Sequence, residues 1–226
     1  MISFFEPYLE YGAEWMPRML DAAGKTAMIT LAGFIVAIMI GSALAFLQQS
    51  RFKTFRAFSQ GYVVLFRGVP LLAVLFLLYF GLPGIGITLT AFNAGAIGLG
   101  LCFGAQMAEV FRAGFEAIHR GQREAALAIG MTPFVSFRLI ILPLVLRIIL
   151  PSLVATFVAL LKDSSLCALI TINELMLEGR ALATEYFLPL HIFIGIGLMY
   201  FAIAWPLSML ARHLNANIQK RKRSAA

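Results

Sequence analysis

The stretch from Ala27 to Leu47, AMITLAGFIVAIMIGSALAFL, contains no charged residue. A helix of about 20 apolar residues crosses the roughly 30 Å hydrocarbon core of a bilayer. The whole chain shares this character, because 61% of its 226 residues are hydrophobic, 13% are charged and the mean hydropathy is +0.88. A soluble domain carries about twice that proportion of charge. The sequence therefore predicts an integral membrane protein and excludes a soluble enzyme and a disordered chain.

Four more apolar segments complete a predicted all-α helical bundle with five transmembrane helices, in one domain over residues 1–226. Arg67 and Pro70 interrupt the second span, and the fourth follows an apolar stretch from Leu139 that we expect to be cytoplasmic or interfacial. The first 20 residues lack a signal-peptide pattern, and for residues 8–24 we expect either an interfacial helix or a loosely ordered leader. The predicted spans are 27–47, 62–80, 91–110, 150–172 and 187–211.

The distribution of basic residues predicts the orientation of these spans. Of the 18 lysines and arginines, Arg67 and Lys162 lie within spans, 13 lie in the 51–56 loop, the 112–147 loop and the C-terminal tail, and three lie on the opposite side. Basic loops favour the cytoplasmic side of a membrane. We therefore expect the N-terminus outside and the C-terminus in the cytoplasm. The net charge of +7 then reflects topology and does not indicate nucleic-acid binding.

Patterns that would indicate catalysis or a cofactor are incomplete. Residues 22–26, AAGKT, resemble the end of a P-loop, but Met19 occupies the position of the first glycine, so we expect no ATP site on this chain. The three histidines lie far apart, which argues against a metal site. Neither serine of the 164–165 pair has a histidine nearby, as nucleophilic catalysis would require. We therefore predict no catalytic residue, no metal and no cofactor bound by this chain.

Small residues recur every four positions along the third span. Such a stripe lets another helix approach closely. We expect these residues to pack against a neighbouring helix and to have no direct role with a ligand: Ala96, Gly100, Gly104 and Ala108.

Charged residues within spans are the candidates for function, because an ion in lipid needs a partner or a water-filled cavity. Glu109 and Arg112 lie three residues apart near the cytoplasmic end of the third span, with Gln106 one turn away. Glu109 and Arg112 could form an ion pair that reaches toward the interface. The position of Gln106 on nearly the same face instead favours a translocation cavity.

Two other polar interruptions lie within spans. Four polar residues, Lys162-Asp163-Ser164-Ser165, occur inside the fourth span and would suit a broken helix that borders a polar cavity. The alternative is a Lys–Asp pair that only assists helix assembly. Arg67-Gly68-Val69-Pro70 interrupts the second span, where a functional site and a structural kink are equally compatible with the sequence.

The 112–147 loop contains a short predicted helix, residues 124–129, with Gly121 ending the preceding helical piece and Gly130 and Pro133 ending this one. A short helix held between glycines in a cytoplasmic loop is a plausible docking element for another protein.

Residues 124–130 and the ILP sequence at 141–143 together resemble the EAA loop of ATP-binding-cassette (ABC) importer permeases. The sequences RGVPLL at 67–72, AEVFR at 108–112 and KDSSL at 162–166 are similar to the polar amino-acid permeases of that family, over about residues 20–215. The resemblance implies a five-span type I importer permease fold in the bacterial inner membrane. Two departures, Gln106 in place of the usual Tyr and Ser164 in place of a common Thr, leave the ligand open.

The resemblance also implies partners. A cytoplasmic ABC ATPase dimer would bind ATP–Mg and receive the coupling helix, a second permease subunit, identical or homologous, would complete the path, and a periplasmic or tethered binding protein would deliver the substrate. Matched position by position, the coupling residues are Gln122, Glu124, Ala125, Ala126 and Gly130.

We therefore expect a permease for polar amino acids or relatives such as opines. Glu109 or Asp163 would meet a substrate amino group, and Lys162 or backbone amides its carboxylate. An ion-coupled secondary carrier or a membrane scaffold are the alternatives. The predicted path residues are Arg67, Gln106, Glu109, Arg112, Lys162, Asp163, Ser164 and Ser165.

Overall fold

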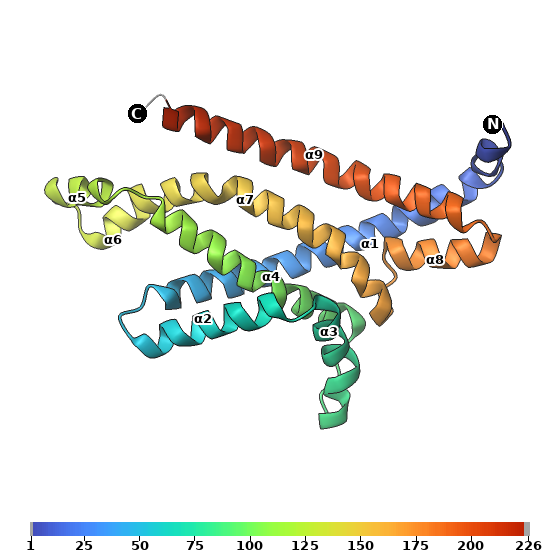
Figure 1. Ribbon diagram of the computed structural model, residues 1–226, viewed down its shortest axis with the longest axis horizontal. Helices are drawn as coiled ribbons and strands as arrows, with labels where there is room; N and C mark the ends of the chain where they lie inside the picture. The colour runs from blue at the N-terminus through green and yellow to red at the C-terminus, as the bar shows by residue number, and fades with distance from the viewer. Residues whose placement is uncertain (1, 224–226) are drawn as a thin grey trace.

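The computed structural model describes residues 2–223, and the elements in that range are all helical. Figure 1 shows three long helices side by side: α1 (Ile2–Gln48), α7 (Leu142–Asp163) and α9 (Pro189–Arg223). Helix α4 (Ala91–Glu116) packs against α1 and α7, and α2 (Lys53–Gly68) packs against α1 and α4. The bundle is therefore built from helices that run along one common long axis.

Four helical stretches of the described chain are long and apolar enough to cross a membrane: Phe4–Gln48, Ala91–Glu116, Pro133–Ile170 and Pro189–Ala216. A fifth candidate is a bent pair, Lys53–Gly68 with Leu71–Ile85, whose parts meet at 101°. The count of four, or five with the bent pair, agrees with the five spans predicted from the sequence.

The second predicted span, 62–80, is not one straight helix. Helix α2 ends at Gly68, and α3 (Leu71–Phe76) leaves the bundle almost at a right angle and continues through η1 (Leu77–Gly81) and η2 (Leu82–Ile85) (Figure 1). The break lies at Val69 and Pro70, because proline has no backbone donor and forces the preceding residue into an extended conformation, here φ −90° and ψ 133°.

The N-terminal segment is also different from the expectation. Residues 8–24 are not a loose leader, since they are helical and continuous with the first span as part of α1. Trp15, Met19 and Ala22 are buried against helix α8 (Leu175–Tyr186) and the first turns of α9. Trp15 and Met19 therefore belong to a second core at the N-terminal end of the bundle, whereas Met16 and Leu20 of the same stretch remain exposed.

The fourth apolar segment is longer than the predicted span 150–172. Helix α6 (Pro133–Ser136), the π-helical turn η3 (Phe137–Ile141), α7 and the 3-10 helix η4 (Ser164–Ile170) follow one another directly. The expected separate lead-in from Leu139 is thus continuous with the span, and Pro151 lies inside α7 without ending it.

Helices α1 and α4 meet along the predicted small-residue stripe. A Cβ atom at Gly100 would lie 2.2 Å from Val36 Cγ1, and one at Gly104 would lie 2.7 Å from Ile40 Cγ2. The approach is reciprocal, because a Cβ at Gly41 of α1 would lie 2.3 Å from Met107 Cβ. The expected packing role of the stripe is confirmed.

We expect Gly41→Ala to destabilise the purified protein by about 1–3 kcal/mol, because the added methyl overpacks the α1–α4 contact. The measurement is the midpoint of thermal denaturation in detergent. Gly24→Ala is the matched control on the same helix, since a Cβ there meets nothing within 4 Å. Equal midpoints for both variants would contradict the close approach.

Candidate functional site

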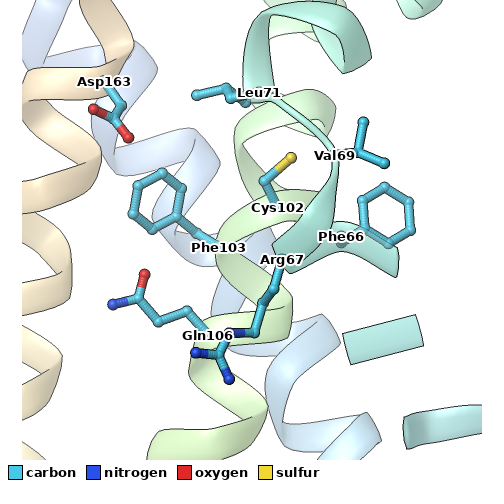
Figure 2. A pocket seen from close by; sticks show the side chains of 8 residues that line it. All are labelled: Phe66, Arg67, Val69, Leu71, Cys102, Phe103, Gln106 and Asp163. Atoms are coloured by element: carbon cyan, nitrogen blue, oxygen red, sulfur yellow. The ribbon is translucent and has the colours of Figure 1, made fainter. Parts of the chain in front are cut away.

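Two adjoining hollows lie on the face formed by α2, α3, α4 and α7. The first has a volume of about 400 Å³ and joins residues from the α2–α3 break, from α4 and from the end of α7. Figure 2 shows Arg67 and Gln106 at one end of this hollow and Asp163 at the other, with the Phe103 ring between them. The side chains that line it are Phe66, Arg67, Val69, Leu71, Cys102, Phe103, Gln106 and Asp163.

The second hollow continues from the first toward the C-terminal end of α4 and the N-terminal half of α7, with a volume of about 370 Å³. Arg67 and Gln106 line both hollows, so the two are continuous along the face. Five predicted path residues therefore meet here, although three different helices carry them: Arg67, Gln106, Glu109, Arg112 and Asp163.

Glu109 and Arg112 form the ion pair that their spacing predicted. Arg112 donates from Nη2 and Nε to Glu109 Oε2, at 2.7 and 3.2 Å, and from Nη1 to Glu116 at 2.8 Å. Both side chains remain partly exposed, 30% for Glu109 and 42% for Arg112. Glu109 therefore forms an ion pair with Arg112 and also lines the second hollow, so the two interpretations of the sequence are compatible.

Arg67 differs from Arg112 in its partners. It is exposed at the end of α2, and within residues 2–223 its guanidinium makes no ion pair with an acid. Glu109, the acid that lines the second hollow beside Arg67, is already paired with Arg112, so the Arg67 guanidinium can bind an anionic ligand group.

The four polar residues 162–165, at the junction of α7 and η4, have different surroundings. Asp163 lines the first hollow, whereas Lys162 is exposed but is not part of the lining of either hollow. Ser164 is fully buried, and Ser165 donates to the Lys162 carbonyl at 2.7 Å. The predicted change in helix geometry is present, since α7 gives way to η4 at Ser164.

Several lining residues were not predicted, and Phe103 and Ser152 show why. Phe103 lies one turn before Gln106 on α4, so helical spacing could have identified it. Ser152 reaches the second hollow from α7 only because α7 crosses α4 at this point, and no local pattern signals that crossing.

The predicted coupling segment is a helix, α5 (Arg120–Ala128), at the opposite end of the bundle from the N-terminus (Figure 1). It begins four residues earlier than expected, and Gly121 lies in its first turn and ends no helix. Helix α4 ends at Glu116 instead. Within α5, Ala126 is buried, while Gln122, Glu124 and Ala125 are exposed.

Gly130 ends this helix through a left-handed backbone conformation, φ +82°. Its amide donates to the Leu127 carbonyl at 3.0 Å, and the Met131 amide donates to the Ala126 carbonyl at 3.1 Å. This pair of bonds is a Schellman motif, which favours glycine at the left-handed position. The predicted stop at Gly130 is confirmed.

An exposed apolar surface surrounds the end of α5. Leu127 is 46% exposed, Ile129 72% and Phe134 70%. Apolar side chains grouped beside exposed polar residues of a short helix are typical of a surface that docks another protein.

Residues 33–224 match the family model described as "Binding-protein-dependent transport system inner membrane component". The chain is 34% identical over 213 residues to "Probable amino-acid ABC transporter permease protein PatM" of Vibrio harveyi, covering 93% of this chain and 96% of that protein. It is 33% identical over 204 residues to "Probable amino-acid permease protein YxeN" of Bacillus subtilis (strain 168), covering 89% and 91%.

A solved structure, "Crystal structure of an amino acid ABC transporter with histidines", is similar in fold and sequence. The superposition gives a TM-score of 0.83 with 28% identity, and it covers 91% of this chain and 96% of that one.

Proposed function

The chain belongs to the family of binding-protein-dependent transport system inner membrane components and is an ABC importer permease subunit, and from this premise we propose that it carries polar amino acids, or relatives such as opines, into a bacterial cell. The names of its relatives support amino acids as the substrate class. The observation that carries the proposal is the polar face, meaning the face of α2, α3, α4 and α7 that holds the two hollows. On it, Arg67 and Asp163 lie at opposite ends of the first hollow.

A zwitterion that leaves water needs a polar partner for each of its charges. Asp163 at one end of the first hollow suits an amino group, and Arg67 at the other suits a carboxylate. The placement favours Arg67 over Lys162 for the carboxylate, because Lys162 is not part of the lining of either hollow. Glu109, already paired with Arg112, would serve the next stage of the path in the second hollow.

Helix α5 with Gly130 would be the coupling element, received by a cytoplasmic ABC ATPase dimer that binds ATP–Mg. Exposed Gln122, Glu124 and Ala125 and the neighbouring apolar surface support this role. Closure of the ATPase dimer would draw two such helices together and switch the permease from inward-facing to outward-facing.

The hollows are open on one side of the subunit, which suits a path completed by a second permease subunit, identical or homologous. The C-terminal end of α9 lies at the same end of the bundle as α5, and the N-terminus lies at the other end (Figure 1). With α5 at the cytoplasmic ATPase, the C-terminus would be cytoplasmic and the N-terminus outside. A periplasmic or tethered binding protein would deliver substrate there.

Uptake into liposomes tests the substrate class. The permease is reconstituted with its ATPase and binding protein, and labelled uptake is challenged with single unlabelled amino acids. We expect competition from one or a few polar amino acids and none from sugars or phosphate. Competition by sugars alone would contradict the proposal.

A further inference from the structure

The side chain of Asp163 lines the first hollow and is exposed. Within residues 2–223 its carboxylate has no hydrogen bond or ion pair. It is the last residue of α7, and η4 and then Thr171, with φ +68°, follow it. Hydrogen bonds in a 3-10 helix have poorer geometry, and a positive φ is rare for a β-branched residue. Contacts from other elements must therefore hold this segment.

Two buried threonines of α1 hold the segment from one side. Thr26 and Thr30 are fully buried and lie one helical turn apart. Thr26 Oγ1 accepts from the Leu175 amide at 3.0 Å, and Thr30 Oγ1 lies 3.4 Å from Oγ of buried Ser164. Each hydroxyl also donates to a carbonyl one turn earlier in α1, as buried threonines in helices commonly do. The contact with the Leu175 amide, in contrast, joins residues 149 positions apart.

A buried glutamate holds the far end of the segment. Glu174 is fully buried, and its Oε1 accepts from the amides of Met176 and Leu177 at 2.9 and 3.0 Å. Its Oε2 accepts from the Tyr200 hydroxyl at 2.6 Å, which ties the start of α8 to α9. Burial raises the pKa of Glu174, while these hydrogen bonds lower it. A buried carboxyl is costly unless it is bonded in this way.

The strained residue between these two anchors has a contact of its own. The Thr171 Oγ1 lies 3.2 Å from the Tyr79 hydroxyl of η1, within hydrogen-bonding distance. The segment 164–175 is thus bonded at its end by Thr26 and Glu174 and in between by Tyr79, while Thr30 packs against Ser164 at its start.

We propose that the buried network of Thr26, Thr30, Ser164, Glu174 and Tyr200 sets the position of Asp163 in the transport path, so that Thr26 and Thr30 are positioning residues for transport. Valine would fill nearly the same space as threonine but has no hydroxyl, so that at position 26 the Leu175 amide would lose its acceptor. Thr26 acts on the 164–175 segment through its hydrogen bond with the Leu175 amide, and Thr30 acts through its packing against Ser164, the residue that follows Asp163. The inference rests on the proposed role of Asp163 in transport.

A double-mutant cycle on the complete transporter tests it. The maximal uptake rate is measured for Thr26→Val with Thr30→Val, for Asp163→Asn, and for all three changes together. The threonine pair alone is expected to slow uptake about 10-fold, because small displacements of positioning groups have effects of this size. Added to Asp163→Asn, the pair is expected to change the rate by less than about 2-fold, since coupled residues are not additive.

The controls separate positioning from general damage. Thr184→Val removes an exposed hydroxyl from α8 and should transport normally, and Thr26→Ser with Thr30→Ser should restore the rate. If the valine pair does not assemble, Thr30→Val alone completes the cycle. A normal rate for the valine variant, or a full additional loss on top of Asp163→Asn, would overturn the inference. A normal rate for Asp163→Asn would overturn the proposed role of Asp163 as well.

Discussion

Replacing Gly130 by valine is expected to abolish coupled uptake, with a loss of about 100-fold or more. The glycine has φ +82°, and in this conformation an L-residue with a branched side chain costs at least about 1–2 kcal/mol. Open space around the position does not relieve the cost, because a Cβ there meets nothing within 4 Å and the strain lies in the backbone. The two bonds that end α5 would break, and α5 would lose its orientation.

The measurement is ATPase retained by the purified permease, together with ATP-driven uptake. Gly121→Ala is the matched control, since it lies in the same helix, has no contact for a Cβ within 4 Å and gains helix propensity. We expect the alanine variant to retain both ATPase and uptake. If the Gly130→Val variant kept its ATPase and full coupling, α5 would not be the coupling element.

Neutralising both acids of the polar face, Glu109→Gln with Asp163→Asn, is expected to reduce uptake by about 100-fold. The two changes keep the shape of each side chain but remove the negative charge that would meet a substrate amino group. Folding should be little affected, because Arg112 keeps Glu116 as its partner.

The readout is the uptake rate per assembled complex, so that a loss of protein is not mistaken for a loss of transport. Glu116→Gln is the control on the same helix, since Glu116 pairs with Arg112 but is not part of the lining of either hollow. An unchanged affinity and rate in the double variant would remove both acids from the transport path.

The apolar runs of the sequence and the spacing of its small residues were sufficient to predict much of the fold. Length and hydropathy predicted the number of spans, and the stripe through Gly100 and Gly104 predicted the face of α4 that another helix, α1, contacts. The right-angle bend after Gly68 was not predicted, because Pro70 signals a break but gives no direction for the chain beyond it. The docking of residues 8–24 on α8 is a long-range contact that no local pattern encodes.

The candidate site was predictable where one helix carries it. Gln106 and Glu109 share a face of α4, so their spacing identified them. The meeting of Arg67 with Asp163 across one hollow depends on how α2 and α7 pack on α4. The sequence also grouped Ser164 with its polar neighbours, whereas the 3-10 turn directs its hydroxyl into the interior.

The energy source of uptake tests the central claim most directly. Liposomes containing the permease, its ATPase and its binding protein are loaded with ATP–Mg, and amino-acid uptake is measured with and without ionophores that collapse ion gradients. We expect uptake to require hydrolysable ATP and to persist without any ion gradient. Uptake that is driven by an ion gradient in the absence of ATP would contradict the account and indicate a secondary carrier.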